Sequence, residues 1–133
     1  MNQIETLGID HLGLTVTSLD QTKAFFLDCL GWSLRGERPE YPAAFVTDGK
    51  CVVTLWQAKG SEPAAFDRRS NIGLHHLALK VADLAALQRV FAQVSAWPGV
   101  SVQFGPELSG KGPRMHCMIF EPGGIRIEFV CDT

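Results

Sequence analysis

The stretch GIDHLGLTV, residues 8–16, decides the fold because the chain contains a second version of it. At an offset of 65 residues it aligns with GLHHLALKV, residues 73–81, and the glycine, one histidine, two leucines and the valine recur. The same offset aligns Trp32 with Trp97, so the register holds for about 25 residues without a gap. A self-match of this length at a fixed spacing indicates an internal duplication.

The ends of the two copies also match each other. Residues 49–56, GKCVVTLW, align with residues 123–130, GGIRIEFV, at an offset of 74. The offset has grown by 74 − 65 = 9 residues, and we place this insertion in the Gly-, Pro- and Ser-rich stretch 105–113. The chain is therefore expected to form one domain with a first module (1–58), a connecting segment (59–71) and a second module (72–133).

Each copy carries the same order of predicted elements. Residues 9–16 are rich in apolar and β-branched side chains, which predicts a strand. Ser18, with Gln21 three residues later, has the form of a capping box, so a helix follows and ends at Gly31. In the second copy Asp83 caps a helix that runs to about Val94. Three strands follow each helix, at about 33–37, 43–47 and 51–57 and at about 100–104, 115–120 and 125–131.

Each module is thus expected to be β-α-β-β-β. A four-stranded sheet with one helix has a second face left to cover, and two modules can cover it by curving their sheets around a shared cleft. We therefore predict an α+β fold in which two βαβββ modules in tandem form a curved mixed sheet around a cleft, with the helices outside.

The composition narrows the classes of partner. Of the 133 residues 46% are hydrophobic and 20% charged, which is typical of a folded domain. The 12 basic and 14 acidic residues give a net charge of −2, so we expect neither nucleic acid nor a membrane surface as a partner. The first residues lack the features of a signal peptide, and the four cysteines form no CxxC pair. We expect a cytoplasmic protein with reduced thiols.

Three polar residues stand out on this frame. His11 and His76 occupy equivalent positions at the first strand of each copy, and Glu128 lies between apolar residues in the last strand of the second copy. A carboxylate in a buried strand is costly unless another group compensates its charge. Two imidazoles and one carboxylate that meet between the modules would bind a divalent metal ion. Two alternatives stay open. In the first, the histidines are structural residues of the core, and in the second, Glu128 forms an ion pair with Arg126.

These same segments resemble the vicinal oxygen chelate superfamily, which includes glyoxalase I, bleomycin resistance proteins and extradiol dioxygenases. The resemblance rests on residues 9–16, the Gly31-Trp32 pair, residues 75–81 and the ending EPGGIRIEF at 121–129. It implies paired βαβββ modules. It also implies that His11, His76 and Glu128 are the ligands of a divalent metal ion, which would be iron, nickel, manganese or zinc.

The resemblance also shows where this chain departs from individual members. The fourth ligand position of the family falls on Thr54, which cannot act as a general base near neutral pH, so this position is expected to be open. The tyrosine of extradiol dioxygenases falls on Met118, and a threonine of fosfomycin resistance proteins falls on Gly13. We expect a metal-dependent lyase, isomerase or dioxygenase acting on a small molecule that chelates the metal through oxygens. The alternative is a metal-independent drug-binding protein of the bleomycin resistance type.

Four more residues are candidates for the cleft. His116 shares strand parity with Met118, so it is a candidate acid or base that faces the cleft, and Met118 is a candidate substrate contact. Trp56 shares the face of Thr54 and is a candidate apolar wall for substrate, with core packing as the alternative. Arg114 follows the predicted insertion and could bind an anionic substrate. The superfamily resemblance further implies a homodimer, in which two chains can share the sites.

Overall fold

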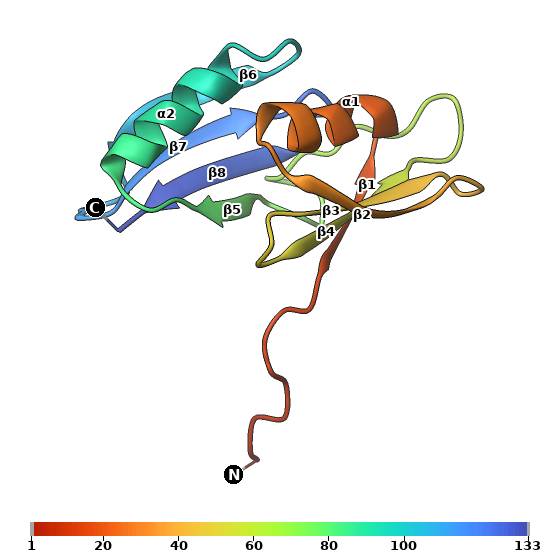
Figure 1. Ribbon diagram of the computed structural model, residues 1–133, viewed down its shortest axis with the longest axis horizontal. Coiled ribbons are helices and arrows are strands. Elements are labelled where there is room, and N and C mark those ends of the chain that lie inside the picture. The colour runs from red at the N-terminus through yellow and green to blue at the C-terminus, as the bar shows by residue number, and fades with distance from the viewer. Residues whose placement is uncertain (1, 133) are drawn as a thin grey trace.

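The computed structural model describes residues 2–132 and contains two copies of the predicted module (Figure 1). The first module consists of β1 (Leu12–Val16), α1 (Leu19–Ala24), the π-helical turn η1 (Phe25–Cys29), β2 (Ser33–Arg38), β3 (Ala43–Thr47) and β4 (Val52–Gln57). The second consists of β5 (Leu77–Lys80), α2 (Leu84–Ser95), β6 (Ser101–Leu108), β7 (Met115–Phe120) and β8 (Arg126–Cys131). Each copy is β-α-β-β-β apart from the extra π-helical turn.

The strands form two separate four-stranded mixed sheets. Their orders are β1-β4-β3-β2 and β5-β8-β7-β6, and in each sheet the first strand of the module runs parallel to its last strand. The other neighbours are antiparallel. The α+β class and the duplicated βαβββ topology are confirmed, and each module contributes its own four-stranded mixed sheet. Among residues 2–132, no helix is both long and apolar enough to cross a lipid bilayer.

The local signals for helices and turns are confirmed in the structure. The Ser18 hydroxyl accepts a hydrogen bond from the Gln21 backbone N–H at 3.3 Å, and the Asp83 carboxylate accepts one from the Ala86 N–H at 2.8 Å. Gly31 follows η1 with φ = +77°, a conformation that glycine adopts without steric cost. These contacts lie within three residues along the chain, which is why the sequence pattern predicts them.

Several boundaries differ from the prediction. The first strand begins at Leu12 and the fifth at Leu77, so His11 and His76 precede their strands by one residue instead of lying inside them. Strand β6 runs to Leu108, so the first four of the nine residues of the predicted insertion at 105–113 extend a strand and only the rest is loop. All four cysteines are free, and Cys51 is exposed while the other three are buried.

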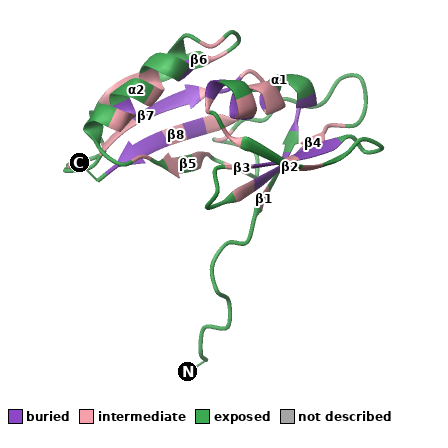
Figure 2. Ribbon diagram, viewed as in Figure 1, coloured by how far each residue is buried: buried purple, intermediate pink, exposed green. Residues whose placement is uncertain are grey.

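The two modules share one hydrophobic core on the helix-bearing side of their sheets (Figure 2). Helix α1 contacts β3 and β4, and α2 contacts β6, β7 and β8. In β1, Leu14 and Val16 are buried in this core, while Gly13 and Thr15 alternate onto the opposite, exposed face. Each sheet therefore has a helix-covered face and an open face. The candidate site residues Thr54 and Glu128 alternate onto these open faces.

Candidate functional site

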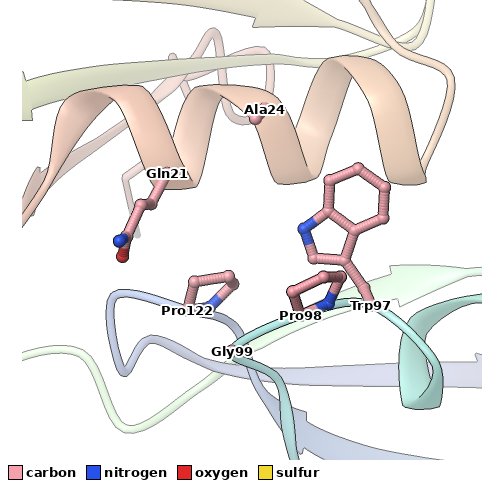
Figure 3. Close-up of a pocket in the computed structure, with 6 residues that line it drawn as sticks. All are labelled: Gln21, Ala24, Trp97, Pro98, Gly99 and Pro122. Carbon is pink, nitrogen blue, oxygen red and sulfur yellow. The ribbon is translucent and has the colours of Figure 1, made fainter.

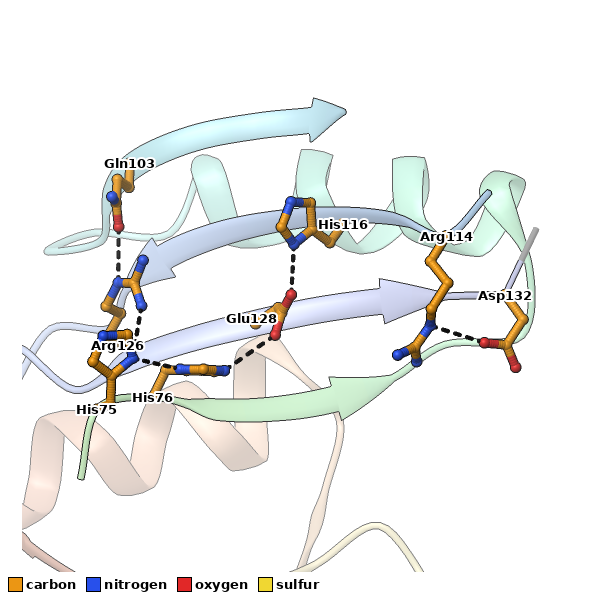
Figure 4. Close-up of polar contacts among 8 residues, drawn as sticks. All are labelled: His75, His76, Gln103, Arg114, His116, Arg126, Glu128 and Asp132. Carbon is orange, nitrogen blue, oxygen red and sulfur yellow. Dashed lines mark hydrogen bonds and ion pairs between the residues drawn. The ribbon is translucent and has the colours of Figure 1, made fainter. Parts of the chain in front are cut away.

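A cluster of two histidines and one glutamate lies on the open face of the second sheet (Figure 4). The Glu128 carboxylate, on β8, is 3.3 Å from His76 Nε2 through Oε1 and 2.5 Å from His116 Nδ1 through Oε2. The side chain of Glu128 is only 14% exposed. Strand register explains the convergence, because β8 lies between β5, which His76 precedes, and β7, which carries His116. We call His76, His116 and Glu128 the second half-site.

The neighbours of His76 fix which of its nitrogens is free. His75 Nδ1 lies 3.4 Å from an Arg126 guanidinium nitrogen, which can only donate, so His75 Nδ1 acts as an acceptor. His75 Nδ1 is also 2.8 Å from His76 Nδ1, which must then carry the proton of that hydrogen bond. With His76 Nδ1 as the donor, the lone pair of a neutral imidazole would lie on Nε2, the atom that faces Glu128. Partial desolvation, together with Arg126 and His76, lowers the pKa of His75, which favours its neutral form as the acceptor.

The alternative partner of Glu128 is not seen in the structure. Arg126 donates to Gln103 at 2.9 Å and to His75, and the only ion pairs of Glu128 among residues 2–132 are with His76 and His116. A partly buried carboxylate beside imidazoles, which forms no ion pair with a lysine or arginine of the described residues, is part of a nitrogen and oxygen donor set that suits a divalent metal ion. Two ligands bound to one such ion at roughly 2.1 Å lie about 3 Å apart, so the His76–Glu128 separation fits.

His11 lines a different place, a cavity of about 470 Å³ on the open face of the first sheet. Its Nδ1 pairs with the Asp10 carboxylate at 2.7 Å, and its side chain is 54% exposed. The cavity is lined entirely by residues of the first module, namely Asp10, His11, Arg35, Arg38, Phe45, Val52, Thr54 and Trp56. We call this cavity the first half-site.

The chain thus separates its predicted metal ligands into two half-sites. Within residues 2–132, no group of three His, Cys, Asp or Glu side chains is arranged to hold a metal ion. His76 and Glu128 come together as the sequence suggests, and His11 does not join them in one chain. A complete set of these three ligands needs the first half-site and the second half-site to face each other.

The other predicted site residues lie in or beside one of the two half-sites, except Arg114. Thr54 and Trp56 lie together in the first half-site, where the indole N–H donates to the Thr54 hydroxyl at 2.9 Å. Met118 pairs with Glu128 across β7 and β8 and is 4% exposed, so it lies beside the second half-site. Arg114 pairs with Asp132 at 3.0 Å at the far end of the sheet, as Figure 4 shows, and makes no contact with this cluster.

Sequence reasoning missed Arg35 and Arg38, which line the first half-site. Residues three apart in a regular strand point to opposite faces, so the pattern gave no reason to group them. The register shifts between Leu34 and Gly36, and this bulge makes Arg35 the extra residue of β2. The glycine inside a predicted strand was the one signal of a bulge.

A second cavity, of about 410 Å³, lies between α1 and the turn that follows α2 (Figure 3). Its lining is Gln21, Ala24, Trp97, Pro98, Gly99 and Pro122, as the same view shows. None of these side chains titrates near neutral pH or is a usual metal ligand. The six residues that line this cavity therefore offer no acid, base or usual metal ligand for catalysis.

Comparison with known proteins agrees with the duplicated fold. Residues 8–129 match the family model of the Glyoxalase/Bleomycin resistance protein/Dioxygenase superfamily. A glyoxylase/bleomycin resistance protein/dioxygenase domain from Frankia sp. EAN1pec superposes with a TM-score of 0.81 at 20% identity, covering 96% of this chain and 93% of that one. A lactoylglutathione lyase from Agrobacterium tumefaciens gives 0.72 at 19% identity, covering 96% of both chains. No curated protein matches significantly, and identities this low show the fold alone.

Proposed function

Because this chain belongs to the Glyoxalase/Bleomycin resistance protein/Dioxygenase superfamily, we propose that it is a divalent-metal-dependent enzyme whose small-molecule substrate binds the metal through oxygen atoms. The observation that carries the proposal is the Glu128 carboxylate, held on the open face of β8 between His76 and His116. His76 Nε2 and the Glu128 carboxylate oxygen Oε1 lie 3.3 Å apart, and in this proposal His11 is the third ligand.

The residues around this pair have distinct tasks in the proposed site. His116 donates its Nδ1–H to Glu128 Oε2 and so keeps Oε1 directed toward His76 Nε2. His75 accepts from His76 Nδ1 and keeps the Nε2 lone pair available. Outer hydrogen bonds of this kind fix the orientation of metal ligands and commonly contribute tenfold to a hundredfold in affinity. His116 is thus proposed as a positioning residue for Glu128.

A bound divalent ion would polarise substrate oxygens and stabilise negative charge that develops on them. Thr54 does not offer a basic group at the fourth position, since its hydroxyl accepts from Trp56 and faces the Leu12 carbonyl at 3.4 Å. A proton-transfer step must then use another group of the chain or of the substrate. This favours a reaction in which polarisation of the substrate is the main contribution.

We further propose that the complete site forms between two chains. The first half-site of one chain would face the second half-site of its partner, which brings His11 to the His76–Glu128 pair. The N-terminal segment 2–10 supports this arrangement, because it is exposed throughout and extends away from the body of the chain (Figure 1). Ile4, Leu7 and Ile9 are 89%, 102% and 89% exposed, and apolar side chains gathered on one exposed segment are typical of a surface that a partner covers.

Metal content tests the catalytic part of the proposal. Protein purified without added metal should hold about one divalent ion per chain. Removal of this ion by a chelator should lower the melting temperature, because an ion that binds only the folded state stabilises that state. Glu128→Gln keeps the shape of the side chain but removes its charge, and should weaken metal binding by about a hundredfold. Glu62→Gln, at an exposed position of the connecting segment, is the matched control and should bind metal normally.

Two results would contradict the proposal. One is a metal content far below one ion per chain that iron, nickel, manganese and zinc all fail to restore. The other is equal metal affinity for the Glu128→Gln variant and the Glu62→Gln control. Either result would favour the alternative of a metal-independent binding protein, for which the aromatic walls of the first half-site would hold the ligand.

A further inference from the structure

We propose that the first half-site is a binding site for an organic oxyanion, in which Arg35 and Arg38 hold a carboxylate or phosphate group and Phe45 and Trp56 contact the apolar body of the same molecule. The claim that the bound molecule is the substrate rests on the proposed function, because His11 lines the same cavity. The claim that an organic oxyanion binds here rests on the cavity alone.

The β-bulge in β2 places both guanidinium groups on one face. Leu34 pairs with Val46, which is buried in the core, and Gly36 pairs with Phe45, which lines the cavity. Arg35 stands between them as the extra residue, and Arg38, opposite Ala43, returns to the cavity face by regular alternation. A bulge that redirects a side chain is common beside active sites. Without it, Arg35 would point away from Arg38.

The charges of the cavity are not balanced within the chain. Among the described residues, neither Arg35 nor Arg38 forms an ion pair, and the nearby Glu37 pairs with Lys23. The only acidic residue in the lining is Asp10, which is occupied by His11 at 2.7 Å. The two positive charges of Arg35 and Arg38 exceed the one negative charge of Asp10, which already pairs with His11. The cavity should therefore attract an anion and repel a cation. Guanidinium groups also match the planar geometry of carboxylate and phosphate oxygens.

Aromatic side chains form an apolar wall next to the arginines. The Arg38 guanidinium lies 5.8 Å from the Phe45 ring centre, and the Trp56 ring is 5.8 Å from the same ring. The hydrogen bond of the indole N–H to Thr54 holds Trp56 in place. Gly13 lies against the cavity residues Thr54 and Trp56, because a Cβ at this position would be 3.2 Å from the Thr54 hydroxyl oxygen and 3.6 Å from the indole nitrogen. A flat apolar group has room beside the charged end.

Calorimetric titration of metal-free protein with three matched probes tests the inference. Benzoate and phenyl phosphate carry the two kinds of oxyanion on the same ring, and benzamide is the neutral counterpart. We expect both anions to bind more tightly than benzamide. Arg35→Gln and Arg38→Gln should each weaken anion binding by about tenfold, the loss expected for a hydrogen bond to a charged group, and leave benzamide unchanged. Arg89→Gln, on the exposed side of α2, is the charge-matched control and should have no effect.

The outcomes separate this inference from the proposed function. The inference is overturned if neither anion binds more tightly than benzamide, or if both arginine variants bind the anions as the Arg89→Gln control does. Preference for benzoate or for phenyl phosphate identifies the oxyanion, and either preference supports the site. Since chelated protein is used, a failure of metal binding leaves these measurements intact. Thermal melts confirm folding of the variants, whose altered side chains are exposed.

Discussion

Glu121 is only 1% exposed, and its carboxyl group has no role in the proposed catalytic site. It accepts hydrogen bonds from the Thr22 hydroxyl of α1 and from the Gly123 backbone N–H in the turn between β7 and β8. This one side chain therefore joins a helix of the first module to a turn of the second. Burial raises its pKa above the usual value, and the hydrogen bonds from Thr22 and Gly123 offset only part of that effect.

The raised pKa of Glu121 predicts a pH-dependent stability. The unfolded chain loses this proton near pH 4.5, while the folded chain keeps it to higher pH, so the folded state binds more protons in between. The contribution of Glu121 is then fully present below pH 4.5 and is lost as the pH rises through the folded pKa. Relative to Glu121→Gln, the wild-type protein should lose unfolding free energy across this window in urea titrations.

The quantity to measure is the difference in unfolding free energy between the wild-type protein and Glu121→Gln. Other carboxyl groups, whose pKa values are lowered, change the stability with pH in the opposite direction. Asp48 and Asp132, whose pKa values lie below the usual range, lose stabilisation as the pH falls. Glu62→Gln is the control for the loss of a carboxyl group at an exposed site. Parallel pH profiles for wild-type protein and Glu121→Gln would show that this carboxyl group ionises normally in the folded state.

At the scale of single elements, the start of α1 depends on a residue from another strand. Gln57, at the end of β4, accepts a hydrogen bond from the Leu19 N–H at 2.7 Å and donates to the Thr17 carbonyl at 2.7 Å. Helix α1 has only six residues before the π-helical turn, so each first-turn N–H that lacks a partner matters. One amide side chain fixes both the helix start and the chain that enters it.

Gln57→Ala should therefore destabilise the protein by about 1–2 kcal/mol, because it removes both hydrogen bonds and leaves the part-buried Leu19 N–H without its partner. Chemical denaturation at pH 7 measures this loss. Gln88→Ala, on the exposed side of α2, controls for the change of residue type and should alter stability by less than about 0.5 kcal/mol. If Gln57→Ala and Gln88→Ala changed the unfolding free energy equally, the Gln57 side chain would not stabilise the start of α1, and Ser18 alone would cap it.

The same elements show how far sequence reasoning reaches. Ser18 and Asp83 were predictable as caps because each contacts an N–H three residues away. The Gln57 contact spans 38 residues, and only the folded sheet brings it to α1. His76 was chosen from the duplication and Glu128 as a charged residue in an apolar strand, and their side chains lie 3.3 Å apart in the structure. Arg35 was missed because a one-residue bulge reverses strand parity, a change to which hydrophobic periodicity is blind.

At the scale of the whole molecule, the shared core decides where the two half-sites can meet. The modules join on the helix-bearing side of their sheets, with the Cys29 thiol in contact with the Gln93 carbonyl at 3.7 Å and Thr17 bonded to Gly123 at 3.3 Å. The open faces lie on the other side of the sheets from this core. We therefore expect the missing half of the site to come from a second chain.

Mixing two defective variants therefore tests the shared site without knowledge of the substrate. In a homodimer with shared sites, a His11→Ala subunit paired with a Glu128→Ala subunit forms one doubly altered site and one intact site. Subunit exchange at equal amounts should restore about one tightly bound metal ion per four chains, since about half of the dimers are then mixed. Each variant alone should bind metal weakly, and light scattering should report a dimer. Failure of the mixture to exceed the separate variants, under conditions where exchange is verified, would place all three ligands in one chain or remove His11 from the set.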